Sequence, residues 1–358
     1  MDLFLPQKDQ LSRLIQEKAE ELLKKLQVLP VEQLGMPDYC LAYFKGSHFK
    51  RLFFSIETSA HLLYNSISLS KKQVQEIVLM DYGAGVGTLY TLAKMIGCHK
   101  VIYNDHLADW KLSAQLIAEA IGVNVDEYIT GDIDSTLHEL SVKNIQCDII
   151  TSRNVIEHIY KLEDFYGAIA SKQPKALVYS STTANYNNPG SRIKHTLWHR
   201  KWEKEYLKER NSFIAGHAPQ LETSIVVSLA TLTRGMAIPE IKKTVDLYTT
   251  SHQLPKPLSI GSNTCDPSNG VWAEHIIPFN EYRKLIDERK YNIHFLPGFW
   301  DTHYSKGWKN LMGKILNSVI KLNRNVGILV APFIYVVAER SPEVGKSESP
   351  KEESGVKS

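Results

Sequence analysis

The chemically richest stretch of the sequence runs from Val78 to Thr88 and reads Val-Leu-Met-Asp-Tyr-Gly-Ala-Gly-Val-Gly-Thr. An apolar run ends in the acid Asp81, and the glycines Gly83, Gly85 and Gly87 follow at alternate positions. Glycine tolerates positive φ and lets a ligand lie against the backbone. A helix that starts beyond such a turn offers unpaired backbone N–H groups. The stretch therefore predicts a strand, a ligand-binding turn and a helix, and the alternative is a tight turn that binds nothing.

Two phosphate-binding patterns fit this turn poorly. The dinucleotide pattern Gly-x-Gly-x-x-Gly requires glycine at position 88, where the sequence has threonine, and no Gly-Lys-Ser/Thr ending follows. The carboxylate of Asp81 would repel a pyrophosphate, whereas it would attract a ligand with an ammonium group and a sulfonium centre. The turn therefore favours a cationic ligand, and a nicotinamide-dependent oxidoreductase is a weaker alternative.

Two further acids stand at the ends of predicted strands. Asp105 closes the apolar stretch that starts at Val101, and Asp132 closes the stretch that starts at Tyr128. The carboxyl ends of parallel strands meet at one edge of a sheet, where α/β proteins bind their ligands. The spacing therefore predicts that Asp81, Asp105 and Asp132 border one crevice. Because aspartate also favours helix N-caps and turns, a structural role is the alternative for the last two.

From about Ile77 to Ser181 the chain resembles the class I S-adenosylmethionine-dependent methyltransferases. The run from Cys147 to Ile159 resembles the fourth strand of that fold and the loop after it. Its Val-Ile-Glu-His-Ile ending is similar to that of small-molecule methyltransferases related to the O-methyltransferases of ubiquinone biosynthesis. The resemblance implies a doubly wound, mostly parallel seven-stranded α/β sheet with a Rossmann-like methyltransferase fold. It also implies S-adenosylmethionine as cofactor and S-adenosylhomocysteine as product.

The resemblance assigns roles to individual residues. Asp105 would bridge the two ribose hydroxyls, while Asp132 would meet the adenine amino group and Ile133 the adenine ring. Asp134 competes with Asp132 for the adenine contact. His48 or Arg51, ahead of the sheet, would reach the cofactor's carboxylate. The expected cofactor-binding set is Asp81, Gly83, Ala84, Gly85, Gly87, Asp105, His106, Asp132, Ile133, Arg153 and Asn154, with Arg51 and His48 as additions.

His158, in the loop after the fourth predicted strand, is the candidate general base. Methyl transfer from a sulfonium depends largely on positioning. A hydroxyl acceptor also has to lose a proton, which a neutral imidazole can take near neutral pH. Bracing of the following helix by Glu157 and His158 is the alternative, and we expect no metal because two adjacent residues do not make a metal site. His199 and His217 are weaker catalytic candidates, and His195 accompanies them.

These residues favour transfer of a methyl group to the hydroxyl oxygen of a small molecule. N- or C-methylation of a metabolite is the alternative, because an amine acceptor needs little help from a base. A non-catalytic binding protein that has kept the methyltransferase fold is the third hypothesis. Trp198, Trp202 and Tyr206 recur at intervals of four residues, so they share a helix face that either packs on the core or forms an aromatic wall for substrate.

The elements that position these residues follow from the hydrophobic pattern. Short apolar runs alternate with helical stretches from Ile77 onward, which predicts parallel strands covered by helices. We expect an N-terminal helical lid (1–76), a cofactor-binding core (77–188), a substrate-covering helical insertion after the fifth strand (189–275), the rest of the core sheet (276–340) and a disordered tail (341–358).

Several elements are predicted with bounds. An amphipathic helix is expected from Leu11 to Leu26, because apolar residues recur there at spacings of three and four. Helices are also expected at Lys194–Arg210, Thr223–Arg234 and Phe279–Arg289. The resemblance implies a last, antiparallel strand, for which Ile328–Glu339 is the candidate.

Composition limits the partners that we expect. Lys and Arg total 42 against 39 Asp and Glu, a formal charge of +3, so the basic excess of a nucleic-acid-binding protein is missing. The four cysteines are scattered, which favours reduced thiols and a cytoplasmic protein. The start of the sequence does not resemble a signal peptide, and no apolar run is long enough to span a bilayer. We expect a small-molecule substrate, no nucleic-acid or membrane partner, and allow a homodimer.

Overall fold

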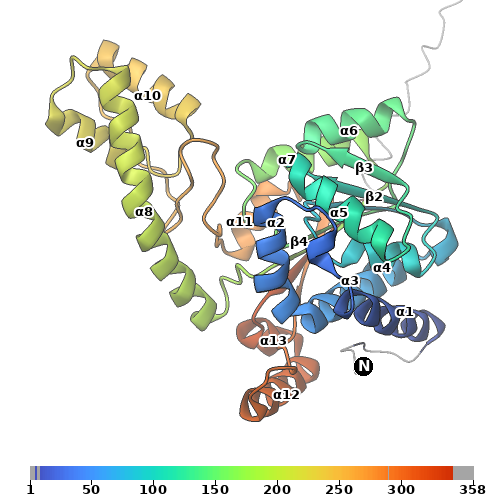
Figure 1. Cartoon of the computed structure of the whole chain (residues 1–358). Helices are drawn as coiled ribbons and strands as arrows, with labels where there is room; N and C mark the ends of the chain where they lie inside the picture. The colour runs from blue at the N-terminus through green and yellow to red at the C-terminus, as the bar shows by residue number, and fades with distance from the viewer. Residues whose placement is uncertain (1–4, 6–8, 289, 342–358) are drawn as a thin grey trace, which may run out of the picture.

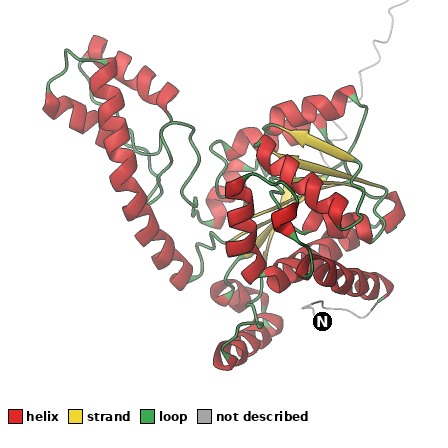
Figure 2. Cartoon of the chain, viewed as in Figure 1, coloured by secondary structure: helices red, strands yellow, loops and turns green. Residues whose placement is uncertain are grey.

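The computed structural model describes residues 5, 9–288 and 290–341. Its centre is a seven-stranded sheet with helices on both faces (Figures 1 and 2). The strand order is β3-β2-β1-β4-β5-β7-β6. The strands are β1 (Val78–Tyr82), β2 (Lys100–Asp105), β3 (Glu127–Thr130), β4 (Ile149–Arg153), β5 (Leu177–Thr182), β6 (Tyr291–Pro297) and β7 (Ile334–Arg340).

The first five strands pair in parallel, and β7 pairs antiparallel with both β5 and β6. The predicted α/β class and seven strands are therefore confirmed, in a sheet that is mixed through β7. The strand order reverses between β1 and β4. The chain after β1 therefore enters the helical layer on one face of the sheet, and the chain after β4 enters the layer on the other face. Such a switch point opens a crevice at the edge where the strands end.

Buried apolar side chains form one core on each face of the sheet. Helices α1 (Gln10–Gln27), α3 (Leu52–Ser70), α4 (Leu89–Met95) and α5 (Ala108–Ala120) cover one face. Helices α6 (Ile133–Val142), α7 (Leu162–Lys172) and α11 (Phe279–Leu285) cover the other. Alternate residues of one strand serve the two cores, as Leu79 and Met80 of β1 do. The alternation of strand side chains thus fixes both layers.

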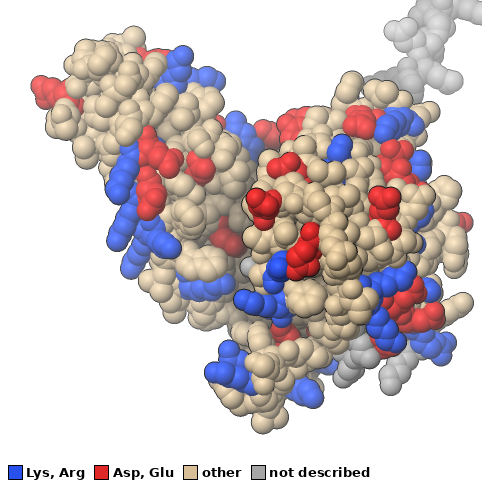
Figure 3. All heavy atoms as spheres, in the orientation of Figure 1, with Lys and Arg blue, Asp and Glu red and all other residues tan. Residues whose placement is uncertain are grey.

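Helices α8 (Pro189–His217), α9 (Thr223–Leu232) and α10 (Ile238–Ser251) form an arm that projects from the sheet (Figure 1). With 29 residues, α8 is roughly 43 Å long. The arm has its own small core, in which Ile214, Leu229 and Val245 are buried. Figure 3 shows a hollow between the arm and the rest of the molecule.

A buried ionic network stiffens the arm. The fully buried Arg210 donates to the Ala230 carbonyl at 2.8 Å and to Glu203 at 2.5 Å. The other carboxylate oxygen of Glu203 accepts from Thr264 at 2.6 Å, in the segment that returns to the sheet. Paired buried charges of this kind hold elements in one arrangement, because breaking the pair leaves a charge buried without a partner.

Several predicted bounds need correction. The segment expected as one strand from Ile328 instead belongs first to helix α13 (Arg324–Val330), and β7 begins only at Ile334. Val and Ile are common in strands, but Asn323 caps this segment as a helix by accepting from the N–H groups of residues 325 and 326. The helix expected at Phe279–Arg289 ends at Leu285, and position 289 lies outside the described residues.

The remaining elements agree more closely with expectation. The amphipathic helix expected from Leu11 is α1, and α8 and α9 contain or match the helices expected in the 189–275 region. Two short helices, α2 (Asp38–Tyr43) and the π-helix Phe44–His48, precede α3. Within the described residues no helix has the length and apolar character needed to cross a membrane. Of the tail expected to be disordered, 342–358 lies outside the described residues.

Candidate active site

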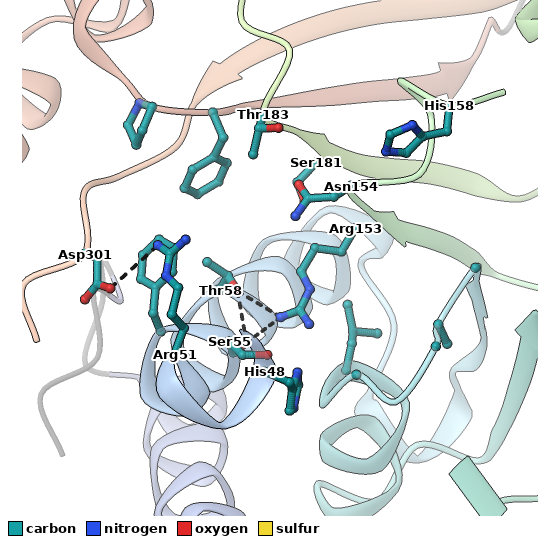
Figure 4. A pocket seen from close by; sticks show the side chains of 18 of the residues that line it. His48, Arg51, Ser55, Thr58, Arg153, Asn154, His158, Ser181, Thr183 and Asp301 are labelled. Atoms are coloured by element: carbon teal, nitrogen blue, oxygen red, sulfur yellow. Dashed lines mark hydrogen bonds and ion pairs between the residues drawn. The ribbon is translucent and has the colours of Figure 1, made fainter. Parts of the chain in front are cut away.

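A cavity of about 930 Å³ opens at the carboxyl ends of β1, β2, β4 and β5. It lies against α3 and the segments that flank α12 (Gly307–Leu322) and α13. Figure 4 shows the side chains that point into it from these elements. The volume is within the range of small-molecule and cofactor sites. Its lining includes Asp81, Gly83, Ala84, Gly85, Gly87, Asp105, Arg153, Asn154 and His158.

The glycine turn is shaped so that side chains would not fit. Gly83 and Gly85 have φ of +66° and +53°, in the left-handed region. A Cβ on Gly83 would lie 2.7 Å from a methyl group of Val155, and one on Gly87 would lie 2.7 Å from the Ala84 carbonyl oxygen. The predicted glycine turn is therefore present, with a tight backbone that favours glycine at these positions.

Asp105 holds the cradle and faces the cavity. One carboxylate oxygen accepts from the Gly85 N–H at 2.9 Å, and the other accepts from the Leu107 N–H at 3.1 Å. The oxygen that accepts from Gly85 still has a free lone pair for a ligand. Beside it, His106 lies 3.2 Å from the same carboxylate, and this hydrogen bond raises the pKa of His106. His106 itself is exposed and does not line the cavity.

Two aromatic residues that the sequence analysis did not single out form a wall beside Asp105. Tyr43 and Trp110 both line the cavity and pack edge to face with centroids 5.3 Å apart. Trp110 lies in the first turn of α5, close after Asp105, whereas Tyr43 comes from α2. No local pattern would pair them, because the contact depends on how α2 packs against α5.

Asp81 is buried at the end of β1, with only 2% of its surface exposed. Burial raises its pKa to about 7, although the positive charge of Arg153 and the Tyr90 N–H at 3.2 Å oppose the rise. Burial also lowers the pKa of the Arg153 guanidinium. One nitrogen of Arg153 donates to the Ser55 carbonyl at 2.6 Å and to the Thr58 hydroxyl at 3.0 Å (Figure 4). The same nitrogen donates to the Ser59 hydroxyl at 3.1 Å. Arg153 thereby ties α3 to the strand ends.

The residues expected at the adenine ring lie elsewhere. Asp132 caps α6, accepting from the backbone N–H of Ser135 at 2.9 Å and from its hydroxyl at 2.6 Å. Neither Asp132 nor Ile133 lines the cavity, and the exposed Asp134 does not line it either. In this structure Asp132 is therefore the N-cap of α6, which is the structural role that the sequence left as the alternative to ligand binding.

The two residues expected at the cofactor's carboxylate both line the cavity. Burial lowers the pKa of His48 to about 3, so its ring is neutral near pH 7. Arg51 lies 3.7 Å from Asp301, with its guanidinium above the Phe54 ring. Arg51 is therefore the better partner for a carboxylate, because it is cationic and half exposed to the cavity.

His158 lies across the cavity from His48 (Figure 4). Its Nδ1 lies 2.8 Å from the carbonyl oxygen of Trp272, which can only accept, so Nδ1 carries the proton. In the neutral ring the Nε2 atom is then left with a lone pair, as a proton acceptor requires. The loop that holds Trp272 pairs with the loop after β4 through His275 N–H to the Glu157 carbonyl at 2.8 Å. The arm's return segment thus sets the tautomer of His158.

The neighbours of His158 are acidic. Glu157 is buried, which raises its pKa to about 7, and one of its oxygens accepts from the Thr183 N–H at 3.3 Å. Glu274 accepts from the Thr183 hydroxyl at 3.1 Å and has φ of +63°. One ligand atom each of Glu157, His158 and Glu274 lie within 4.8 Å of one another. No pattern in the sequence marks Glu274, which the fold brings from the far end of the arm segment.

The other histidines differ in position. His199 donates from Nε2 to the Glu274 carbonyl and accepts at Nδ1 from Ser262, so both ring nitrogens are occupied. His217 pairs with Asp246 at 2.6 Å, at the other end of α8. Neither lines the cavity. His195 lies beside the acidic neighbours of His158, with its Nε2 3.5 Å from the Glu274 carboxylate.

A second cavity of about 580 Å³ lies between His158 and the arm. Trp198, Trp202, Tyr206 and Trp272 line it, and His158 lines both cavities. The Trp202 and Tyr206 rings stack with centroids 5.8 Å apart. The aromatic residues that share a face of α8 therefore form a cavity wall instead of packing on the core.

No protein-family model and no curated protein matches the sequence. Structural similarity was found to the ribosomal protein L11 methylase of Lactobacillus delbrueckii subsp. bulgaricus (17% identity, 35% of this chain and 60% of that one, TM-score 0.28). A putative S-adenosylmethionine-dependent methyltransferase from Streptococcus mutans is also similar (14% identity, 37% of this chain and 37% of that one, TM-score 0.29). So is TrmN from Thermus thermophilus (17% identity, 35% of this chain and 38% of that one, TM-score 0.28). This chain thus spans three-fifths of the L11 methylase, and at these scores the likeness identifies no function.

Proposed function

We propose that this chain is an S-adenosylmethionine-dependent methyltransferase that methylates a hydroxyl of a small molecule. The observation that carries the proposal is the arrangement of the glycine cradle, Asp105 and Asp81 around one cavity. These groups suit a ligand that has a diol at one end and a net positive charge at the other. S-adenosylmethionine has both, and it supplies a methyl group activated by attachment to a sulfonium.

The chain's residues fit such a ligand. Asp105 presents its carboxylate to the cavity, and the oxygen bonded to Gly85 has a free lone pair for a ribose hydroxyl. Tyr43 and Trp110 offer aromatic surfaces beside it for a flat base. The Asp81 carboxylate, when ionised, favours a cation nearby, and Arg51 can bind a carboxylate. Asp132 and Ile133 remain proposed adenine contacts only if α6 moves toward the cavity.

The acceptor belongs on the side of His158. This histidine separates the donor cavity from the aromatic second cavity, so a molecule in the second cavity meets the donor there. Its bare Nε2 can accept the hydrogen bond of an acceptor hydroxyl and orient it. The walls of Trp198, Trp202 and Tyr206 favour a flat or apolar acceptor. Positioning of the two reactants supplies most of the rate enhancement in such a site.

Calorimetry on the full chain tests the proposal. S-adenosylhomocysteine and S-adenosylmethionine should each bind at one site, whereas NADH should not. Absence of heat at about millimolar ligand would contradict the proposal. A Kd above that concentration corresponds to a binding free energy weaker than about 4 kcal/mol, which is too weak for a cofactor site. Binding of both ligands without methyl transfer to any supplied phenol, alcohol or amine would favour the non-catalytic alternative.

A further inference from the structure

The buried His195 and the partly buried His158 lie at the junction of core and arm, each close to the Glu274 carboxylate. His158 donates from Nδ1 to the Trp272 carbonyl at 2.8 Å, and His195 donates from Nδ1 to the Ser191 carbonyl at 2.7 Å. In the neutral form of either ring, Nε2 is then the nitrogen that keeps a lone pair for a ligand. Fixing Nδ1–H on a backbone carbonyl is the arrangement that orients histidine ligands in metal sites.

Two carboxylates face these nitrogens. Glu157 is only 1% exposed, and its Oε2 has no hydrogen-bond partner among the described residues. Glu274 lies within 4.8 Å of Glu157 and His158, atom to atom, and its Oε2 is 3.5 Å from Nε2 of His195. That nitrogen is also buried without a hydrogen bond in the described structure. Buried polar atoms without partners are costly, and a bound cation would satisfy all of them.

The backbone also favours a ligand role for Glu274. Its φ of +63° lies in the left-handed region, which is unfavourable for glutamate. The conformation is held by the Thr183 hydroxyl at 3.1 Å and by His199, which donates to the Glu274 carbonyl at 2.8 Å. Strained residues that the surroundings hold in place are concentrated at functional sites.

We propose that Glu157, His158, His195 and Glu274 bind one divalent transition-metal cation between the core and the arm. Two imidazoles and two carboxylates suit Zn²⁺, Mn²⁺ or Fe²⁺ better than Mg²⁺ or Ca²⁺, which prefer oxygen ligands alone. This replaces the expectation of no metal, which considered Glu157 and His158 alone. The other ligands come from α8 and from the loop that closes the arm.

A cation here would also act on the acceptor. His158 lines both cavities, so the cation would lie between donor and acceptor sites. An acceptor hydroxyl bound to it would have a lower pKa and would release its proton to solvent. His158 would then be a ligand instead of the proton acceptor. This catalytic role rests on the proposed function, whereas binding of the cation does not.

Titration of the chelator-treated full chain with Zn²⁺, Mn²⁺ and Mg²⁺ tests the site. We expect one Zn²⁺ per chain, weaker Mn²⁺ binding visible by electron paramagnetic resonance, and Mg²⁺ weaker still. Glu157→Gln and His195→Gln should each weaken Zn²⁺ binding by roughly 10- to 100-fold. His217→Gln is the matched control, because it removes a histidine–carboxylate pair elsewhere in the arm.

The wild-type titration keeps the proposal falsifiable if a variant fails to fold. No saturable Zn²⁺ binding by the wild type would overturn it, as would equal losses in the control variant. Because these measurements need neither methyl donor nor acceptor, they separate failure of the metal site from failure of the proposed function.

A second inference concerns α12, which projects away from the sheet (Figure 1). Gly313, Asn317 and Ile320 are its buried residues. The opposite side is apolar and exposed, and its members recur at helical spacing: Trp308, Leu311, Met312, Ile315 and Leu322, with Trp308 at 64% and Leu322 at 85% exposed. Such a stripe needs a partner, because exposed apolar patches of this kind mark interaction sites.

The charge around this stripe has one sign. From residue 302 to residue 338 the sequence contains no aspartate or glutamate. It contains five cations, all exposed: Lys306, Lys309, Lys314, Lys321 and Arg324. A cationic helix with an apolar face containing tryptophan is the pattern of helices that lie in the interface of an anionic bilayer.

The geometry points to α12 as a docking helix for an anionic membrane surface, contrary to the expectation of no membrane partner. The exposed Val326 and Leu329 of α13 would extend the contact. Trp300 and Tyr304 before α12 and Phe333 after α13 line the main cavity. A membrane bound at α12 would therefore lie next to the cavity, where an acceptor dissolved in lipid is within reach.

Sedimentation of the full chain with lipid vesicles tests this surface. Binding should be at least about tenfold stronger to vesicles with roughly 30% phosphatidylglycerol than to neutral phosphatidylcholine, and should fall with salt. Leu311→Glu should abolish it, whereas Leu247→Glu, at a 65% exposed position of α10, should not. Equal binding by both variants would overturn the proposal. So would a dimer in solution that Leu311→Glu dissociates without any vesicle binding by the wild type.

Discussion

Replacement of Asp105 by asparagine is the most informative single change in the proposed donor site. The side chain keeps its shape, but one acceptor oxygen becomes an N–H donor and the charge is lost. In the native protein both oxygens accept backbone N–H groups, from Gly85 at 2.9 Å and Leu107 at 3.1 Å. The variant therefore has to leave one of these backbone donors unpaired and can offer a ribose diol only one acceptor.

Both losses have estimable sizes. A hydrogen bond to a charged group contributes about 1.5–3 kcal/mol, so the affinity for S-adenosylhomocysteine should fall roughly 10- to 150-fold. The unpaired N–H should lower the free energy of unfolding by about 1–3 kcal/mol. Calorimetry with S-adenosylhomocysteine measures the first effect, and urea unfolding measures the second.

Asp126→Asn is the matched control for this change. Asp126 also accepts a backbone N–H, from Val101 at 2.8 Å, but it lies at the opposite edge of the sheet. It should lose stability without losing affinity for S-adenosylhomocysteine. If Asp105→Asn bound the ligand as tightly as the wild type, the assignment of Asp105 to the ribose would be wrong.

Three further changes test the cradle and the buried charges. Gly83→Ala should lower the free energy of unfolding by at least about 1–2 kcal/mol in urea, because φ is +66° and the new Cβ meets Val155; an unchanged midpoint would contradict this. Arg153→Met should lower the free energy of unfolding by about 3–5 kcal/mol in the same assay, because it removes three hydrogen bonds and leaves Asp81 without a compensating charge. A decrease below about 1 kcal/mol would refute the role of Arg153 in holding α3 to the strand ends. Because burial raises the pKa of Asp81 to about 7, its carboxylate ionises as pH rises through that value, so affinity for the cationic S-adenosylmethionine should increase from about pH 6 to about pH 8; calorimetry showing a decrease, or the same rise in Asp81→Asn, would contradict it.

Features that depend on local sequence were predictable. The glycine turn and Asp105 lie in consecutive strand-to-helix connections, so hydrophobic alternation and residue type were enough to bring them to one edge. Asp132 has the same local context, yet its side chain turns to the N–H of Ser135 and leaves the cavity. Local sequence does not decide between capping and ligand binding, because aspartate suits both.

Features that depend on distant packing were not predictable. Tyr43 reaches Trp110 only because α2 packs on α5, and Glu274 reaches His158 only because the arm's return segment pairs with the loop after β4. Neither contact leaves a periodic pattern in the sequence. The strand expected from Ile328 failed for a local reason, since the Asn323 cap outweighs the preference of Val and Ile for strands.

The central claim is that the cavity at the ends of β1, β2 and β4 holds a methyl donor. A crystal structure of the chain with S-adenosylhomocysteine tests it most directly. We expect the ribose hydroxyls within hydrogen-bonding distance of the Asp105 carboxylate, and the sulfur on the side of His158. Electron density for the ligand at any other place, with the turn from Gly83 to Gly87 empty, would contradict the account.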